Sequence, residues 1–186
     1  MNRVLIFSVI LFAAAIALYY YQDSVRQQQI EVAGAEGEQR PDFTAKTLRS
    51  RSYDENGLLA HQIWASDMAH FSNNEFTSFK SPKVVVYPNG KQAGWTLNAE
   101  QGRLRENQLI LEQQVVIETQ TEQNQTNTLL TEYVEMDLAS NEVSSDQPVT
   151  VKGPSYQLQG VGLRGNVEKE QIELLSDVKA TYEPEK

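Results

Sequence analysis

Cysteine is absent from the 186-residue sequence, and histidine occurs only at His61 and His70. Without cysteine there is no disulfide framework and no thiolate zinc site, a composition compatible with either the cytosol or the periplasm. The two histidines belong to no H-E-x-x-H motif, and the sequence contains no nucleophile elbow. We therefore predict no enzymatic activity, no cofactor and no metal site, and expect both histidines to be ordinary core or surface residues.

Positive charge is also scarce. The 16 Lys and Arg are outnumbered by 25 Asp and Glu, which gives a formal net charge of −9. Nucleic-acid binding requires clustered basic side chains that neutralise phosphates, whereas the only local basic group here is Lys46, Arg49 and Arg51. We interpret that group as the solvated face of a strand, and the composition argues against nucleic acid as a partner.

Helix signals are missing after residue 30, but one long apolar run precedes that point. Residues 4–21 carry no charge, and in a helix they would span about 27 Å, close to the thickness of a bilayer core. Arg3 precedes the run and Asp23 follows it, so the positive-inside rule places the N-terminus in the cytoplasm and the remainder outside. A cleaved signal peptide, with small residues at 33–35, is the alternative interpretation.

The polar composition after the apolar run predicts a tether. Residues 22–42 are rich in Gln, Glu, Gly and Ala, and Pro41 marks where folding begins. The predicted organisation is a transmembrane anchor over 1–21, a tether over 22–42 and a folded β-domain over 43–186.

The folded part opens with a predicted β-hairpin. Residues 43–53 and 58–64 flank Asp54-Glu55-Asn56-Gly57, and Asn-Gly favours the positive φ angles of a tight hairpin turn. Further turn signals occur at Pro88-Asn89-Gly90, over 122–128 and at Lys152-Gly153-Pro154.

A repeat organises the rest of the chain. The stretch 95–119 is interpreted as short strands separated by polar breaks at 105–108 and 112–114, and similar outlines begin at 65, 99, 131 and 162, with spacings of 31 to 34 residues. Such a period is typical of stacked supersecondary units that bury one another's apolar faces. Short strands with regular turns indicate an antiparallel sandwich, jelly roll or open barrel.

Two features of these strands need interpretation. Gly160-Val161-Gly162-Leu163-Arg164-Gly165 matches a dinucleotide fingerprint, but that fingerprint requires a following helix, and the repeat predicts strand; glycines in strands more often mark bulges or close backbone approach. Apolar residues also occupy successive positions, as at 84–86, 109–111 and 115–117. They indicate covered outer faces, a partner at the edge or an interior that holds lipid, and an ordinary two-layer core explains them equally well.

Several motifs in a fixed order resemble the LptC family of lipopolysaccharide transport. They are the stretch P-D-F-x-A-x-x-L-R-S-R-S-Y-D-E-N-G from Pro41, Phe79-x-x-Pro82, the repeat at 95–117, Val151-x-Gly153, Leu163-Arg164-Gly165-Asn166 and Thr181-Tyr182-Glu183. The resemblance extends over nearly the whole chain and implies an all-β fold, an antiparallel twisted β-jelly roll of the OstA-like type, in the periplasm behind a single inner-membrane helix.

The resemblance also implies a function and partners. The family accepts lipopolysaccharide from the ABC transporter formed by LptB, LptF and LptG and passes it to LptA, without catalysis. A structural adaptor that bridges these partners without binding lipid is an alternative, and a secreted carbohydrate-active enzyme with a carboxylate pair in a cleft is a third.

On this basis two sets of residues are expected to form sites. The lipid-contacting groove is predicted to contain Leu48, Ile63, Phe79, Val84, Leu109, Leu111, Val115, Ile172 and Leu174. The partner-binding surfaces are predicted to contain Phe43 and Ala45 at the N-terminal edge, Gly153, Val178, Ala180 and Tyr182 at the C-terminal edge, and Ala13 and Ala17 on a small-residue face of the anchor suited to helix packing.

Overall fold

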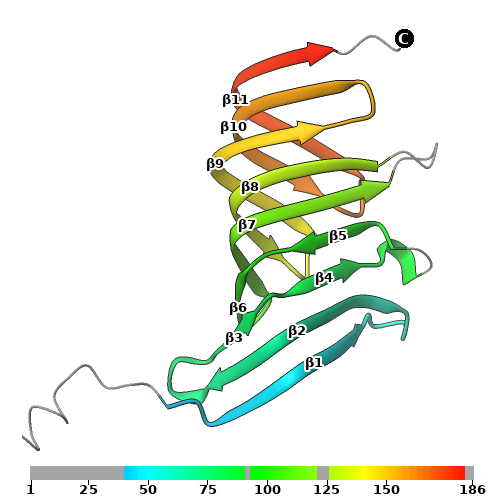
Figure 1. Cartoon of the computed structure of the whole chain (residues 1–186). Coiled ribbons are helices and arrows are strands. Elements are labelled where there is room, and N and C mark those ends of the chain that lie inside the picture. The colour runs from blue at the N-terminus through cyan, green and yellow to red at the C-terminus, as the bar shows by residue number, and fades with distance from the viewer. Residues whose placement is uncertain (1–39, 91–92, 121–125, 183–186) are drawn as a thin grey trace, which may run out of the picture. The chain divides into compact units, whose positions relative to one another are not determined.

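The computed structural model describes residues 40–90, 93–120 and 126–182. The predicted anchor, most of the tether and most of the 122–128 loop lie outside these ranges. Within them, no helix is long and apolar enough to cross a membrane. The chain divides into the units Met1–Arg40 and Pro41–Lys186, and the description below concerns the second (Figure 1).

Over the described residues this unit is built from strands, with two short 3-10 turns at Ser72–Asn74 and Pro88–Gly90. The strand pairs are antiparallel, which confirms the predicted fold class. The strands are β1 (Phe43–Tyr53), β2 (Leu59–Phe71), β3 (Phe76–Lys80), β4 (Lys83–Val86), β5 (Trp95–Asn98), β6 (Gln101–Arg105), β7 (Gln108–Gln120), β8 (Thr126–Asp137), β9 (Glu142–Lys152), β10 (Tyr156–Asn166) and β11 (Gln171–Tyr182).

The long strands take part in two zones of pairing. The first half of β7, 108–112, pairs with β6, whereas its second half, 116–119, pairs with β5. The same division runs through the unit, and Figure 1 shows the ribbons of β7 to β11 turning back along one side. We call the two zones wall A and wall B. Wall A comprises 48–53, 59–64, 83–86, 95–98, 115–120, 126–131, 148–152, 156–161 and 179–182; wall B comprises 43–46, 67–71, 76–80, 101–105, 108–112, 133–137, 142–145, 163–166 and 171–174.

The walls meet along a line of bends, which we call the seam. In β7 the pairing register shifts between Glu112 and Val115, and Gln113 and Gln114 have φ angles of 66° and 51°. A bulge of this kind leaves residues unpaired and increases the local twist, so the strand changes direction without ending. The predicted division of this stretch into two short strands at 112–114 was therefore wrong, because the polar residues form a bulge within one long strand.

Other bends of the seam also use unusual backbone. Ser81, Gly162 and Asp177 lie where β3 meets β4 and where β10 and β11 bend, and all three have positive φ angles. Gly162 lies inside the dinucleotide-like stretch, which belongs to β10 and leads into β11 without a helix. The interpretation of that stretch as strand is confirmed.

The first hairpin forms as predicted between β1 and β2. The Asp54 carboxylate accepts hydrogen bonds from the backbone N–H groups of Asn56 and Leu58, at 2.9 and 2.7 Å. Gly57 has a φ angle of +76°, which glycine adopts without steric cost. Turn chemistry in the sequence is thus sufficient to set this register.

The core lies between the walls, and burial alternates along two of the three apolar runs. Leu109 and Leu111 are fully buried in it, whereas Ile110 between them points outward and is half-buried. Val115 and Ile117 likewise point inward, and Val116 between them is half-buried outside. These two runs therefore have one side in the core and a partly covered outward member, whereas all three valines at 84–86 are buried.

Candidate functional site

The interior is lined by two rows of residues that run across the strands, from β2 to β11. Residues that pair directly across neighbouring strands form one inward-facing row along wall A, from β2 to β11, and a second row along wall B. The wall A row is Ile63, Val84, Leu97, Ile117, Leu129, Val151, Leu158 and Ala180; the wall B row is His70, Thr77, Leu104, Leu109, Met136, Val143, Gly165 and Ile172.

The structure brings most of the predicted groove residues together in this interior. Ile63, Phe79, Val84, Leu109, Leu111 and Val115 are buried in the core, and Leu48 and Leu174 pack against it from the outer strands β1 and β11. Ile172 has 36% of its surface exposed. It faces the same way as Leu174, two residues along the last strand, and is exposed because no further strand follows β11 in the described chain.

The middle of the interior is filled by the protein's own side chains. Leu97, Leu109, Leu111, Ile117 and Leu129 each have 0% exposure. A ligand could therefore bind in the middle of the interior only if the two walls separate.

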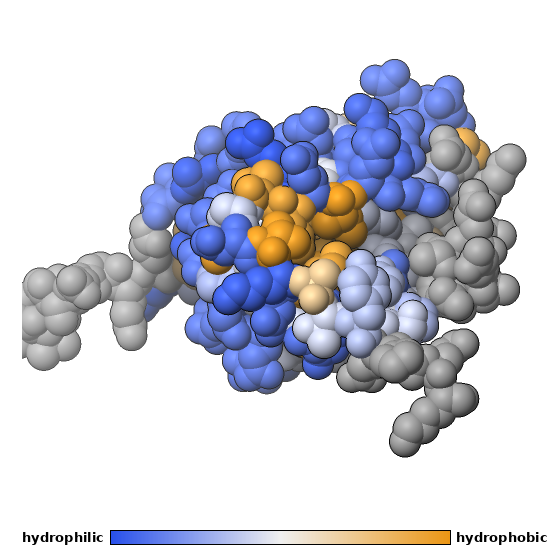
Figure 2. All heavy atoms as spheres, turned by 90° about the horizontal axis from the view of Figure 1, so that it is seen from above, coloured by the Kyte–Doolittle hydropathy of each residue, from blue (hydrophilic) through white to orange (hydrophobic). Residues whose placement is uncertain are grey.

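The two ends differ from the middle because each terminates in an edge strand. At the β1 end, Phe43 is 55% exposed and stacks on His70 with ring centroids 4.7 Å apart, and Ala45 beside it is half-buried. At the β11 end, Val178 and Tyr182 are 54% and 74% exposed. Figure 2, which looks onto this end, shows apolar side chains gathered in the centre and surrounded by hydrophilic ones.

The remaining predicted partner residues fall into two groups. Ala180 is exposed on β11, and Gly153 lies in the β9–β10 turn against the ring of Tyr156. Ala13 and Ala17 lie outside the described residues.

The side opposite the seam, which we call the mouth, contains contacts that the sequence did not indicate. His61 of β2, 6% exposed, bonds through Nε2 to Oδ1 of Asn141 in the β8–β9 turn at 3.1 Å. Burial lowers the pKa of His61, and the hydrogen bond to Asn141 partly opposes that shift. The tip of Trp95, on β5, lies above the backbone of Gly165, on β10. These contacts join wall A to wall B over large sequence separations, so no local pattern predicts them.

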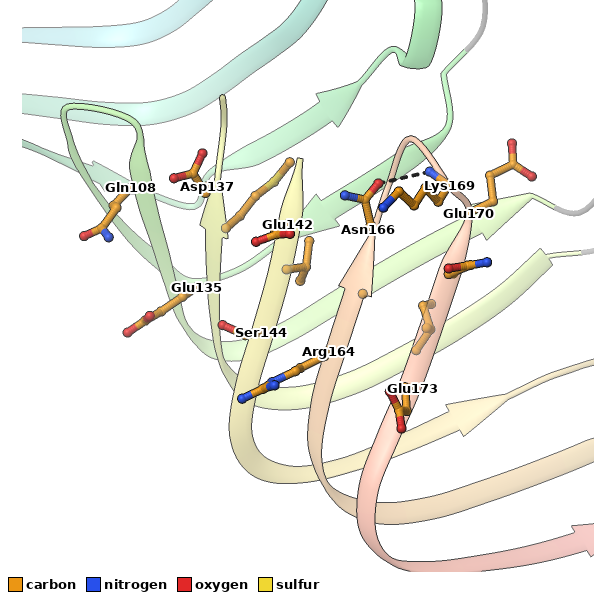
Figure 3. A pocket seen from close by; sticks show the side chains of 15 residues that line it. Gln108, Glu135, Asp137, Glu142, Ser144, Arg164, Asn166, Lys169, Glu170 and Glu173 are labelled. Carbon is orange, nitrogen blue, oxygen red and sulfur yellow. Dashed lines mark hydrogen bonds between the residues drawn. The ribbon is translucent and has the colours of Figure 1, made fainter. Parts of the chain in front are cut away.

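An open pocket of about 960 Å³ lies along wall B and is lined by residues of β7 to β11 and of the β10–β11 turn (Figure 3). It contains five carboxylates, at Glu135, Asp137, Glu142, Glu170 and Glu173, together with Arg164 and Lys169. Figure 3 shows the carboxylates distributed over several strands and the β10–β11 turn, and they do not converge on one point. In this pocket, the described side chains do not form the acid–base pair that a glycosidase needs.

The architecture defines a class of protein: long antiparallel strands, bent along one seam, stacked into two walls that end in edge strands. The same fold occurs in the crystal structure of LptH, described as the LptA homologous periplasmic component of the conserved lipopolysaccharide transport device from Pseudomonas aeruginosa. The match has a TM-score of 0.53 and covers 67% of this chain and 95% of that chain, at 8% sequence identity. At this identity the likeness shows the fold alone.

The sequence identifies the family. Residues 8–183 match the LptC family, described as lipopolysaccharide-assembly, LptC-related, and the chain belongs to that family. The lipopolysaccharide export system protein LptC of Haemophilus influenzae is 26% identical, over 78% of each chain. The protein of the same name from Escherichia coli K12 is 22% identical, over 77% of this chain and 75% of its own.

Proposed function

We propose that this chain is a membrane-anchored conduit for lipopolysaccharide, which receives the lipid from the LptB, LptF and LptG transporter and passes it to LptA. Its family is described as lipopolysaccharide-assembly, LptC-related, and its relatives carry the name lipopolysaccharide export system protein. The observation that carries the proposal is the registered wall A row, which runs from Ile63 on β2 to Ala180 on β11.

The edge strands fit the proposed direction of transfer. An unpaired strand edge can accept a strand from another chain, and exposed edges are normally avoided because they promote aggregation. Here the β1 edge would face the transporter, and the β11 edge, with exposed Val178 and Tyr182, would pair with LptA. In this arrangement the rows of neighbouring jelly rolls become continuous.

Hydrophobic burial is the driving force that this interior can supply. A chain with a formal charge of −9 does not attract a phosphorylated lipid by its net charge, whereas burial of acyl chains contributes about 0.8 kcal/mol per CH₂ group. Rows of interchangeable Leu, Ile and Val side chains favour no single position along the path. That property suits a protein that has to release its cargo.

An adaptor that joins its partners without binding lipid is the second candidate. The observation that favours it is the filled interior, where Leu97, Leu109 and Ile117 have 0% exposure. The two candidates differ in whether the walls separate around lipid.

Site-specific photo-crosslinking distinguishes the two candidates. A photoreactive amino acid at Ile172 or Leu174, which face the interior, is expected to capture lipopolysaccharide in cells. Glu173, which lies between them and faces outward, is the matched control. Capture at 172 and 174 with none at 173 supports the conduit, whereas pull-down of LptA with no lipid at any position supports the adaptor and overturns the conduit.

A further inference from the structure

Two side-chain contacts connect the two sides of the fold across the mouth. The first joins His61 in wall A to Asn141 in the β8–β9 turn, with 3.1 Å between Nε2 and Oδ1 and 80 residues between the two positions. The Asn141 carbonyl also accepts a hydrogen bond from the Val167 N–H at 2.9 Å. Val167 is fully buried in the core, so the turn that presents Asn141 is held in place.

The second contact is between an aromatic ring and a glycine. Trp95, 2% exposed, comes from wall A and passes over Gly165 in wall B. A Cβ atom at Gly165 would lie 3.3 Å from Cη2 of Trp95 and 2.9 Å from the Gln171 carbonyl oxygen. Glycine at 165 therefore allows the ring to pack directly on the backbone of the opposite wall.

Both contacts run diagonally across the mouth. His61 and Trp95 lie on β2 and β5, in the N-terminal half of wall A, whereas Gly165 belongs to the C-terminal half of wall B and Asn141 to the β8–β9 turn, which directly precedes 142–145 of wall B. At the seam the walls are joined by continuous backbone through bends such as Gln113-Gln114. At the mouth these contacts are made by side chains, and a neutral side-chain hydrogen bond contributes little net free energy because water replaces it when it opens. The mouth, unlike the seam, can therefore open without a change in the course of the backbone from one wall to the other.

We propose that the pairs His61–Asn141 and Trp95–Gly165 form a latch across the mouth, which opens while the walls hinge at the seam to admit lipid acyl chains. This inference rests on the proposed conduit function. It follows from the filled interior, since lipid and side chains such as Leu97 and Leu111 cannot occupy the same space. Opening at the mouth separates the walls without breaking the strand pairing within either of them.

The absence of native cysteine allows a direct test on the full-length chain in membranes with its transporter. Thiols are introduced by His61→Cys and Asn141→Cys. The two Cβ atoms are separated by a whole histidine and asparagine side chain, so a short bifunctional methanethiosulfonate reagent, which reductant cleaves, joins the two thiols. The readout is lipopolysaccharide captured by a photoreactive residue at Leu174.

A matched control joins two strands within one wall. Gln101 of β6 and Glu112 of β7 are directly paired in wall B, so Gln101→Cys with Glu112→Cys receives the same reagent without restraining the mouth. Joining 61 to 141 is expected to abolish capture of lipopolysaccharide, and reductant is expected to restore it. Joining 101 to 112 is expected to leave capture unchanged.

Three outcomes would count against the proposal in different ways. Equal capture before and after joining 61 to 141 overturns the latch and leaves the conduit intact. No capture by the parent chain, which carries no introduced thiols, overturns the conduit and the latch together. The variant Asn141→Ala provides an independent check, because it removes the hydrogen bond without a reagent. It should capture at least as much lipid as the parent, and a fall to background in a variant that melts at the parent's temperature overturns the latch.

Discussion

Gly153 lies directly beneath the ring of Tyr156, so close that a Cβ atom at position 153 would overlap the ring carbons. The Gly153 N–H donates to the Tyr156 carbonyl at 2.9 Å, and the Tyr156 hydroxyl donates to Asn127 at 3.1 Å. A side chain at 153 therefore displaces Tyr156 next to the predicted LptA-binding edge.

The first prediction is that Gly153→Arg weakens binding to LptA more than it destabilises the fold. Moving Tyr156 costs one hydrogen bond, about 1 kcal/mol, while it changes the surface beside β11. LptA pull-down and thermal melting of the same preparation measure the two effects. Tyr156→Phe is the control, since it removes the hydroxyl and keeps the ring, and it should retain LptA. Undiminished pull-down by Gly153→Arg contradicts the prediction.

The second prediction uses neighbouring residues on opposite faces of β7. Leu111→Ala should lower the free energy of unfolding by about 2–5 kcal/mol, because Leu111 is fully buried and its removal leaves a cavity. Ile110→Ala, at a half-buried outward position, should cost roughly 1 kcal/mol. Urea denaturation of both variants measures the difference, and equal losses would show that the inward and outward assignments of β7 are incorrect.

The third prediction concerns the pH dependence of stability. Burial lowers the pKa of His61 below the value of 6.5 expected in the unfolded chain. As pH falls below 6.5 the unfolded chain takes up this proton before the folded chain does, so the free energy of unfolding decreases in that range and is unaffected by this group above it. His61→Gln should flatten the slope measured by denaturation between about pH 7 and 5.

Two aspartates act in a separate and more acidic range. A hydrogen bond from the Ser72 backbone holds the pKa of Asp42 below 3.8, and one from the Ser140 backbone does the same for Asp137. Their stabilising contribution is complete above pH 3.8 and is lost as pH falls through their lowered pKa values. A loss of stability confined to pH below 4 in the native chain would argue that His61 has little influence.

The fourth prediction tests the first hairpin. Gly57 has a φ angle of +76° with open space around the position of a Cβ atom, so Gly57→Ala should destabilise by roughly 1 kcal/mol through backbone strain alone. Glu55→Ala in the same turn is the control and should be nearly neutral. Thermal melts of the two variants give the comparison, and a neutral Gly57→Ala would mean that the turn adjusts its backbone at no cost.

Local patterns in the sequence were sufficient for most of the strands and for the first hairpin, whereas the continuous apolar runs did not show which of their residues face inward. Short apolar runs bounded by polar breaks indicate strands, and Asn56-Gly57 defines a turn within four residues. These signals need no knowledge of distant parts of the chain. The polar break at 112–114 was visible in the sequence as well, but a bulge and a turn use the same residue types, so its meaning depended on the pairing partners.

The latch could not be predicted because it depends on how two walls come together. His61 and Asn141 are polar residues at unremarkable positions, and only the twist of the stacked strands brings them within 3.1 Å. Gly165 gave a partial signal, since a glycine within a strand indicates close approach by another group. The sequence did not indicate that this group is Trp95.

The registered rows also set a length scale. In the described chain, nine stretches succeed one another in each wall, and neighbouring strands lie about 4.8 Å apart, so the path from edge to edge is roughly 38 Å. Each strand contributes one residue to a row, so the number of strands sets the length of the row. A chain that gained one more pair of strands would reach about 10 Å further with the same lining, so the distance such a protein spans can change in evolution while its interior chemistry stays constant.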